Sequence, residues 1–418
     1  MYIFPGYTRY YEENGAIYVT SDVYQSTIKL SDSTFQKEFY SMVQTGGCQS
    51  LASPLAVFLH EQGLIANKDE ICTVLEQTRK LLEDTLMITI LPTERCNFRC
   101  PYCYESHVPT SMRRETLDLI LKYIKDQALR FKTINLGWFG GEPTLCKDVV
   151  IEATSFIQTL SNVEHIRFKS SITTNGFLLD VETFKQFYSA GITSYQITLD
   201  GWNHDKTRPL ASGKGTLATI IQNLHDISNL SQDEYQFHIT LRHNVLEGDT
   251  DYSWYDYLQR LFGDDKRFYM FVHPVGNWGG ETVETLNLLK GKDSESLILE
   301  HIEYIKRIGL QCENGRTSLF SKICYASYPH SMVFRSDGRI EKCTVAMNHP
   351  KNQLGVVDSI NGITIDNRVN NLWSNTVFKN ECYTCKDVLS CFNMRCNRNA
   401  VVKGCSNSRC SAELSKIY

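Results

Sequence analysis

Three closely spaced cysteines are the residues of this chain whose type and spacing point most directly to chemistry. Cys96, Cys100 and Cys103 follow one another in the pattern CxxxCxxC. A closed structural zinc site normally has four ligands, so three thiolates leave either a missing partner or an open position. Soft thiolates also bind iron–sulfur clusters, and a cluster held by only three cysteines keeps one iron free for a substrate or cofactor. The spacing alone is therefore compatible with zinc and with an iron–sulfur cluster.

A second group of cysteines lies in the last quarter of the chain. The 15 cysteines among 418 residues are too few for a disulfide scaffold, and unusually many for a reducing compartment unless the thiolates hold metal. Cys48, Cys72 and Cys146 stand alone and are expected to be small buried hydrophobic residues. Two separate groups therefore indicate two metal-bearing units. The second group consists of Cys312, Cys324, Cys343, Cys382, Cys385, Cys391, Cys396, Cys405 and Cys410.

The first cysteine group follows the first of a series of predicted strands. Between these strands lie amphipathic helical stretches, as expected for repeated β-then-α units. Such units predict an α/β fold with a parallel sheet that is either doubly wound or curled into a partial barrel. In both folds the chemistry belongs at the carboxyl ends of the strands. The predicted strands are 86–91, 133–139, 166–173, 194–199, 237–245 and 268–274.

Glycine and polar residues gather where each of these strands ends. Because the carboxyl ends of parallel strands lie at one edge of a sheet, we expect these residues to form a single active site. A glycine pair also lets the backbone approach a ligand closely. In chain order these residues are Gly140, Gly141, Glu142 and Pro143, then Asn175, Asp200, Arg242 and Asn244, and finally His273, Pro274, Gly276 and Asn277.

Two further segments flank the predicted barrel, which spans 85–310. Residues 1–84 show short strand patterns at 17–20 and 26–31, followed by helical patterns over 31–47, 53–65 and 68–82. This is the size of a peptide-binding or winged-helix module. Residues 311–418 contain short strands, including a hairpin with its turn at Asp337-Gly338, and we expect their cysteines to hold them together.

Charge and hydropathy exclude several classes of function. The formal charge of −4, from 43 Lys plus Arg and 47 Asp plus Glu, offers no electrostatic argument for a nucleic-acid partner. No apolar run approaches the roughly 20 residues of a membrane-spanning helix, and the first residues lack the pattern of a signal peptide. We therefore expect a soluble cytoplasmic protein with neither a nucleic-acid nor a membrane partner.

Taken together, CxxxCxxC after the first strand, Tyr102 before its third cysteine and the Gly-Gly-Glu-Pro turn after the second strand resemble the radical S-adenosylmethionine (SAM) superfamily. The resemblance covers residues 86–310 and implies a (β/α)6 partial TIM barrel. It implies that Cys96, Cys100 and Cys103 bind a 4Fe-4S cluster whose fourth iron is chelated by S-adenosyl-L-methionine. In that family one electron cleaves SAM to a 5′-deoxyadenosyl radical, which takes a hydrogen atom from the substrate.

The resemblance also implies a set of SAM contacts. The Glu142 carboxylate would pair with the SAM ammonium group and Arg242 with its carboxylate, while Asn175 and Asp200 would contact the ribose or the methionine. Each of these four residues has a plainer reading as part of a turn or as a solvated strand arginine. No catalytic residue or base is identified. The expected cofactor-binding residues are Tyr102, Gly140, Gly141, Glu142, Pro143, Asn175, Asp200 and Arg242.

The C-terminal cysteines resemble the SPASM extension found on many radical SAM enzymes, which holds two auxiliary 4Fe-4S clusters. Carried over by position, one auxiliary cluster would use Cys324, Cys343 and Cys396, and its fourth site would be open or filled by Cys312. The other would use Cys382, Cys385 and Cys391, with Cys405 or Cys410 as the last ligand. The gap between Cys391 and Cys396 is one residue longer than the usual three. Zinc-ribbon sites would explain the CxxC pairs without the other elements.

Radical SAM enzymes with SPASM domains mostly modify peptides, and residues 1–84 resemble the winged-helix-like recognition element of ribosomally synthesised peptide (RiPP) maturases. Such a module binds a leader sequence by adding it as a strand to a sheet edge; a structural cap is the alternative. The resemblance implies a precursor-peptide partner, a flavodoxin- or ferredoxin-type electron donor and an oxidoreductase that forms a crosslink, first of all a thioether, with C–C or C–O bonds as variants.

Other functions remain open at this point. A sulfatase-maturating enzyme that generates formylglycine is disfavoured by the long N-terminal segment and by Thr344 after Cys343, where Asp is usual. A peptide epimerase and a non-enzymatic zinc protein are the further alternatives.

Overall fold

The computed structural model describes the chain except residues 25, 281, 290, 314–322, 375–381, 386, 387, 389–397, 399, 400 and 403–418, and it describes only the backbone of 291–293. The chain folds into two compact units. Of the described residues, unit 1 comprises Met1–Glu83 and those within Thr317–Pro329 and Asn371–Leu414, and unit 2 comprises those within Asp84–Arg316 and His330–Asn370. The expected boundary near residue 85 coincides with the start of unit 2, whereas the segment 311–418 is divided between the units.

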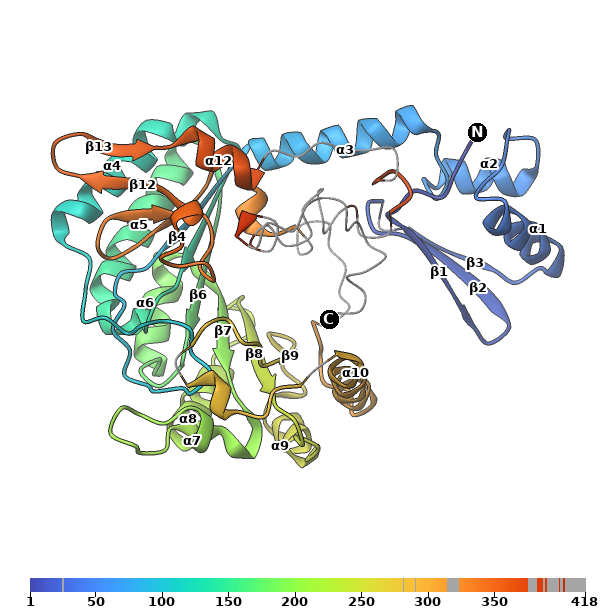
Figure 1. Cartoon of the computed structure of the whole chain (residues 1–418). Helices are drawn as coiled ribbons and strands as arrows, with labels where there is room; N and C mark the ends of the chain where they lie inside the picture. Colours follow the sequence, from blue (N-terminus) through green and yellow to red (C-terminus); the bar gives the residue numbers. More distant parts are fainter. Residues whose placement is uncertain are drawn as a thin grey trace. The chain divides into compact units, whose positions relative to one another are not determined.

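Unit 2 is built on a large sheet, which has ten strands among the described residues, in the order β13-β12-β11-β10-β4-β5-β6-β7-β8-β9 (Figure 1). Strands β4 to β9 are all parallel to their neighbours. This confirms the predicted α/β class and its parallel sheet, and each strand lies close to its predicted range. The strands are β4 (Thr85–Ile90), β5 (Thr133–Trp138), β6 (Arg167–Thr174), β7 (Ile192–Thr198), β8 (His238–Val245) and β9 (Phe268–Pro274).

Amphipathic helices connect the parallel strands and cover the sheet. In α4, Leu117, Ile120, Leu121 and Ile124 recur at helical spacing and are buried, so one stripe of the helix packs against the strands. Alternate residues of β4, such as Leu86, Ile88 and Ile90, are fully buried in the same core. The helices are α4 (Arg114–Gln127), α5 (Lys147–Val163), α6 (Val181–Ala190), α7 (His204–Thr207), α8 (Leu217–Ser228), α9 (Ser253–Phe262) and α10 (Gly291–Arg307).

Part of the C-terminal segment extends this sheet. Strand β10 pairs in parallel with β4, and the next three strands continue antiparallel. The predicted turn at Asp337-Gly338 joins β10 and β11, and Gly338 has a φ of +90°, which favours glycine. A buried ion pair between Arg335 and Glu94 ties the hairpin to the segment after β4. The added elements are β10 (Ser331–Phe334), β11 (Arg339–Glu341), β12 (Gln353–Asp358), β13 (Gly362–Ile365) and α12 (Asn367–Ser374).

Unit 1 contains a small antiparallel sheet, three-stranded in its described residues, in the order β1-β2-β3. Both predicted strand patterns are present as β2 (Ala16–Ser21) and β3 (Thr27–Leu30), while β1 (Thr8–Glu13) was not predicted because its exposed TRYYEE sequence does not alternate. The three predicted helices are α1 (Ser33–Gln44), α2 (Pro54–Glu61) and α3 (Lys68–Glu83).

Capping residues explain where the first two helices begin. Asp32 accepts hydrogen bonds from the backbone N–H groups of Thr34 and Phe35, and Ser53 accepts one from Ala56. Whether this unit is a leader-recognition element remains a prediction. In the described part of the chain, no helix has the length and apolar character needed to cross a membrane.

Candidate active site

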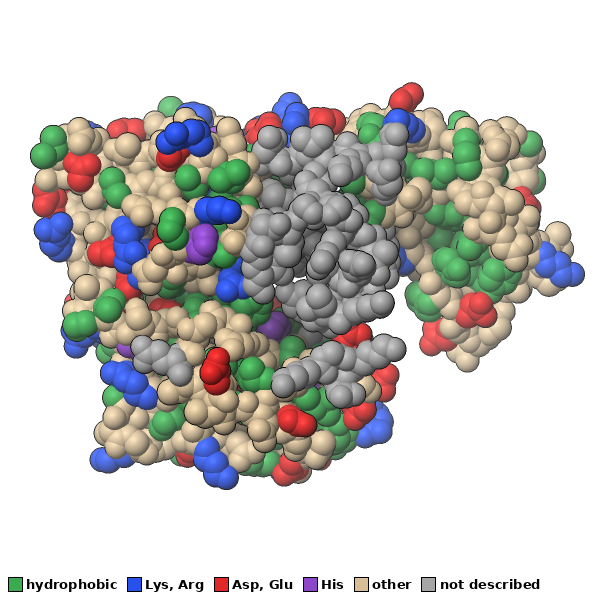
Figure 2. Space-filling model, in the orientation of Figure 1, with side chains coloured by type: hydrophobic (Ala, Val, Ile, Leu, Met, Phe, Trp, Pro, Cys, Tyr) green, Lys and Arg blue, Asp and Glu red, His purple; other side chains and the backbone are tan. Residues whose placement is uncertain are grey.

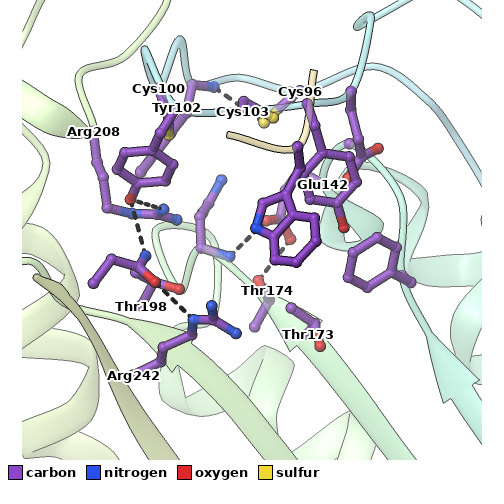
Figure 3. A pocket seen from close by; sticks show the side chains of 18 of the residues that line it. Cys96, Cys100, Tyr102, Cys103, Glu142, Thr173, Thr174, Thr198, Arg208 and Arg242 are labelled. Atoms are coloured by element: carbon purple, nitrogen blue, oxygen red, sulfur yellow. Dashed lines mark hydrogen bonds between the residues drawn. The ribbon is translucent and has the colours of Figure 1, made fainter. Parts of the chain in front are cut away.

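A cavity of about 200 Å³ lies at the carboxyl end of the parallel strands of unit 2 (Figure 3). All six strands, β4 to β9, contribute residues to its wall, either from their last positions or from the loops that follow. The sequence predicted this convergence from the residues that follow each strand. The cavity therefore has the position expected of an active site in a parallel α/β fold.

The three clustered cysteines all line this cavity. They lie on the loop 91–113 between β4 and α4, hereafter the cysteine loop. Burial raises the pKa of Cys96 and of Cys103 to about 12, with further contributions from Glu142 and Glu105, respectively. Burial also raises the pKa of Cys100. Without a cation beside them these thiols are protonated at neutral pH, and metal binding would release their protons.

The chemistry of this donor set fits an iron–sulfur cluster, because three soft thiols face one cavity. Among the residues that the structure describes, no three His, Cys, Asp or Glu side chains are grouped closely enough to hold a single metal ion.

The Gly140-Gly141 turn packs directly against the cysteine loop. A Cβ atom at Gly140, whose φ is +103°, would lie 2.5 Å from the carbonyl oxygen of Thr93, and one at Gly141 would lie 2.1 Å from that of Arg95. The backbone N–H of Glu142 also donates to the Arg95 carbonyl at 2.8 Å. Both glycines are thus required for the close approach of two backbones, and both line the cavity.

Glu142 is 1% exposed, and its carboxylate holds several elements of the site together. It accepts hydrogen bonds from the backbone and hydroxyl of Thr144, from the Thr174 hydroxyl at 2.6 Å and from the Asn175 backbone at 2.7 Å. Three of these donors bond to Oε1 and one to Oε2, so most of the acceptor capacity of the carboxylate is used within the protein. In this arrangement Glu142 fixes the end of β6 relative to the Gly-Gly turn.

Asn175 joins the end of β6 to the cysteine loop. Its side-chain amide donates to Asn97 Oδ1 at 2.7 Å, and its Oδ1 accepts from the backbone of Phe177 at 3.0 Å. Asn175 also lines the cavity.

Tyr102 is the centre of a buried polar network. Its hydroxyl donates to Asp200 Oδ2 and accepts from Arg208 Nη1 at 2.8 Å and from Asn244 Nδ2 at 3.3 Å. Asp200 accepts further hydrogen bonds from the Thr207 hydroxyl and the Asn244 backbone. This network connects the cysteine loop to the ends of β7 and β8.

Six of the eight residues expected to bind SAM line the cavity, namely Tyr102, Gly140, Gly141, Glu142, Asn175 and Arg242. The other two do not: Asp200 contacts the lining residues Tyr102 and Asn244, and Pro143 is buried at the start of a 3-10 helix (Pro143–Cys146). Arg242 Nε donates to Asn244 Oδ1 at 2.8 Å, and its guanidinium lies 5.8 Å from the centre of the Phe271 ring. Of the residues at the end of β9, Pro274 and Gly276 line the cavity, whereas His273 and Asn277 do not.

Several lining residues were not predicted from the sequence. Tyr104 and Glu105 directly follow Cys103, and this proximity to a candidate ligand could have predicted that they line the site. Burial, with the charge of Glu94, raises the pKa of Glu105 to about 8, and its Oε2 has no hydrogen-bond partner among the described residues. Arg208 follows α7, and no motif or periodic pattern in the sequence places it at the site. The unpredicted residues include Phe98, Tyr104, Glu105, His107, Arg208 and Trp278.

The C-terminal cysteines are distributed over both units. In unit 2, Cys343 is buried beyond β11, and Tyr104 has its pKa raised by burial and by Cys103 and Cys343 together. Cys312 forms a backbone bridge with Met270 of β9. In unit 1 lie Cys324, Cys382 and Cys385. The expected ligands outside the described residues are Cys391, Cys396, Cys405 and Cys410.

The three cysteines expected to be small buried hydrophobic residues, Cys48, Cys72 and Cys146, are only half-buried, so the expected burial is wrong. Cys48 forms a backbone bridge with Tyr2, and Cys146 Sγ lies 3.9 Å from the hydroxyl oxygen of Ser111. Cys72, on α3, hydrogen-bonds to Tyr383, whose pKa is raised by that bond and also by Cys382. Cys72 therefore lies in the part of unit 1 that contains the Cys382-Cys385 pair.

The family model described as the radical SAM superfamily matches residues 90–261. This stretch includes the cysteine loop, the Gly-Gly-Glu turn and the strands that carry most of the cavity. Residues 90–261, less than half of the chain, are therefore similar to the radical SAM superfamily, and the protein is an enzyme. The family implies a 4Fe-4S cluster and S-adenosylmethionine as cofactors.

Two curated relatives are named GTP 3′,8-cyclase. The one from Haemophilus ducreyi is 27% identical over 240 residues, which cover 52% of this chain and 67% of that protein. The one from Campylobacter jejuni is 33% identical over 150 residues, which cover 34% of this chain and 43% of that protein. The match to the second relative thus spans less than half of its length.

Two solved structures share the fold. Native anSMEcpe with bound AdoMet has a TM-score of 0.51 at 18% identity, with 73% of this chain and 88% of that chain covered. Streptococcus suis SuiB bound to the precursor peptide SuiA has a TM-score of 0.50 at 13% identity, with 94% of this chain and 95% of that chain covered. At these identities the likeness establishes the architecture, a mixed α/β fold with a large parallel sheet.

Proposed function

We propose that this enzyme is a radical SAM maturase that modifies a ribosomally made precursor peptide. The observation that carries the proposal is the cavity itself, in which three thiols, a Gly-Gly-Glu turn and the ends of six parallel strands meet. In the proposal Cys96, Cys100 and Cys103 hold a 4Fe-4S cluster. When bound, the cluster supplies the electron that cleaves SAM to a 5′-deoxyadenosyl radical.

The chain's own residues bind and orient the reactants. Glu142 keeps the Gly-Gly turn against the cysteine loop, so that the backbone of the turn faces the cavity. Arg242 is the proposed partner for the SAM carboxylate, because it is a cation at the end of β8 that lines the same cavity. Tyr102 and Asp200 hold the opposite side of the loop.

The aromatic wall of the cavity supports radical chemistry. Phe98, Tyr104, Phe139 and Trp278 line it. Large apolar side chains exclude water from the space in which a reactive carbon radical must meet its substrate. A peptide segment that fills the remaining opening would complete this exclusion.

A peptide substrate is supported by unit 1 and by the structure of SuiB with its precursor peptide, whose fold covers 94% of this chain. Among the described residues, β1 and β3 are the two edges of the unit 1 sheet, so each can pair with an added strand. Hydrophobic side chains gather over this sheet in Figure 2, and Tyr10 and Tyr11 of β1 are 46% and 49% exposed. We infer that the leader of the precursor binds here.

The proposed reaction forms a crosslink in the core of the peptide, first of all a thioether. In the proposed reaction the 5′-deoxyadenosyl radical takes one hydrogen atom from a carbon, and a cysteine thiol loses its proton as its sulfur bonds to that carbon. The remaining electron passes to an auxiliary cluster, so the peptide loses two hydrogens. The C-terminal cysteines would hold two auxiliary 4Fe-4S clusters, one of them near Cys343 and one near the Cys382-Cys385 pair.

Cyclisation of GTP is the second candidate, because relatives that are 27% and 33% identical over part of this chain carry the name GTP 3′,8-cyclase. A nucleoside triphosphate needs several cationic partners. Arg208 and Arg242 line the cavity, but the buried carboxylate of Glu142 lines it too, which makes the site less suited to a polyanion.

Mass spectrometry separates these functions. Anaerobically reconstituted enzyme is incubated with SAM, dithionite and a precursor peptide encoded near its gene, and a parallel reaction contains GTP in place of the peptide. A loss of two hydrogens from the peptide core supports the crosslink. An unchanged peptide mass with altered residue stereochemistry indicates an epimerase, conversion of one Cys or Ser to formylglycine indicates a sulfatase-type maturase, and consumption of GTP indicates the cyclase.

A further inference from the structure

A short segment after α7 pairs with the cysteine loop in antiparallel fashion. The backbone N–H of Arg99 donates to the Pro209 carbonyl at 2.9 Å, and that of Ala211 donates to the Asn97 carbonyl at 2.8 Å. Phe98 and Leu210 form the bridge between them. This pairing fixes the backbone at position 208 beside the part of the loop that contains Cys100.

The side chain of Arg208 contacts the residues on both sides of Cys100. Its Nη1 donates to the Tyr102 hydroxyl at 2.8 Å, and its guanidinium carbon lies 5.7 Å from the centre of the Phe98 ring. Arg208 is only 9% exposed and lines the same cavity as the three thiols. Figure 3 shows Arg208, Tyr102 and Cys100 on the same side of that cavity.

Arg208 also has a donor that the described residues do not use. Its Nε is buried and has no hydrogen-bond partner among them. A buried donor without a partner is costly, which indicates that another group accepts from it in the working enzyme. Arg208 is a buried cation that lines the same cavity as the three thiols, so its charge would favour negative charge on their sulfurs.

We propose that Arg208 stabilises the reduced form of the cluster held through Cys100 and thereby sets its reduction potential. The inference rests on the proposed function, in which the three cysteines hold that cluster. One-electron reduction, by dithionite in the test and by a low-potential electron-transfer protein in the cell, adds one negative charge to the cluster. A buried cation and a hydrogen bond to the cluster or its ligands favour the form that carries this extra charge.

Arg99, which lies in the cysteine loop next to Cys100, is a suitable control for Arg208. Its Nη1 donates to the carbonyl oxygens of Cys96 and Phe98. Unlike Arg208, however, Arg99 is exposed. Water and salt screen an exposed charge far more than a buried one, so Arg99 should contribute little to the potential.

The test is a redox titration of the reconstituted full-length enzyme, monitored by electron paramagnetic resonance of the reduced cluster. Only the cluster that binds SAM should change its line shape when SAM is added, so this change distinguishes its signal from those of the auxiliary clusters. We expect Arg208→Gln to make reduction about tenfold less favourable, which for one electron is a shift of about 59 mV to a more negative potential. Arg208→Lys, which keeps the charge, should shift it less, and Arg99→Gln should leave it unchanged.

The outcomes distinguish this inference from the proposed function. An Arg208→Gln enzyme with the wild-type potential would overturn the role of Arg208, and so would an Arg208→Lys enzyme with the full shift. If Arg208→Gln does not retain iron, Arg208→Lys is compared with Arg99→Gln instead. We expect the reduction potential of the cluster to shift further in Arg208→Lys than in Arg99→Gln, and equal potentials would overturn the role of Arg208. A wild-type enzyme without a SAM-responsive cluster would instead refute the proposed function, and this inference with it.

Discussion

The Tyr102 hydroxyl donates a hydrogen bond to the carboxylate of Asp200, which lies 98 residues further along the chain. This bond connects the cysteine loop to the end of β7, and Arg208 and Asn244 donate to the same hydroxyl. The arrangement means that the position of the loop depends on contacts made by distant strands rather than on the loop alone.

Replacing Tyr102 by Phe should therefore destabilise unit 2. The substitution removes one hydroxyl and leaves buried groups of Asp200, Arg208 and Asn244 without a shared partner, which costs about 1–3 kcal/mol. Urea unfolding of the cluster-free protein measures the change in the free energy of unfolding. Tyr10→Phe, at a position that is 46% exposed, is the control and should change it by less than about 0.5 kcal/mol. Equal effects of the two substitutions would show that the network contributes no stability.

Glu142→Gln should weaken both folding and SAM binding. Its carboxylate accepts hydrogen bonds from four donors. A glutamine side chain would place its own N–H donors against some of these donors, which costs about 1–3 kcal/mol of stability. Calorimetry should show weaker SAM binding, because the Gly-Gly turn loses its fixed position. Glu164→Gln, at an exposed position, should have no effect on either quantity. Unchanged SAM affinity in Glu142→Gln would contradict the positioning role.

The pKa of Glu105 predicts a pH dependence of stability in the cluster-free protein. Burial raises this pKa from 4.5 to about 8, so the folded protein keeps a proton that the unfolded chain releases near pH 4.5. The stability linked to this group is complete below pH 4.5 and is lost as the pH rises toward 8. Glu105→Gln should remove that loss between pH 6.5 and 8. This window also avoids His204 and His273, whose pKa values burial lowers to about 4. Parallel stability curves for both proteins would disprove the shift.

Tyr11→Ser should weaken binding of the precursor leader. Tyr11 lies on strand β1 and stacks on Tyr18 at 5.1 Å between ring centres, so it offers an aromatic surface beside a strand edge that no other described strand covers. We expect about a tenfold loss of peptide affinity, or about 1.4 kcal/mol, by fluorescence anisotropy. SAM cleavage without peptide should be unaffected. Leu129→Ser, at a residue of unit 2 that is 76% exposed, is the control. Wild-type affinity in Tyr11→Ser would place the leader elsewhere.

Periodicity predicted those parts of the fold that rest on local patterns. The six parallel strands and the capped helices of unit 1 follow from alternation, helical spacing and capping residues such as Asp32 and Ser53. Strand β1 could not be found in this way, since an exposed edge strand has no buried face to impose alternation. The pairing of β10 with β4 was equally hidden, because four residues pair with a strand far away in the sequence.

The site residues also differ in whether a local sequence pattern could predict them. The three cysteines and the Gly-Gly-Glu turn have fixed spacing and were predicted. Arg208 was not, because its contact with Tyr102 arises from a pairing of two loops that have no periodic pattern. The role of Glu142 also emerged only in three dimensions. Its type suggested a partner for an ammonium group, whereas its surroundings show a carboxylate that holds the end of β6.

The central claim is that the three cysteines of this cavity hold the cluster that cleaves SAM. Its most direct test is the amount of 5′-deoxyadenosine formed from SAM and dithionite by reconstituted wild-type, Cys100→Ala and Cys146→Ala enzymes. Cys146 is the control because it lies outside the cavity lining. The account predicts that Cys100→Ala forms no 5′-deoxyadenosine while Cys146→Ala forms as much as the wild type. Undiminished formation by Cys100→Ala would contradict it.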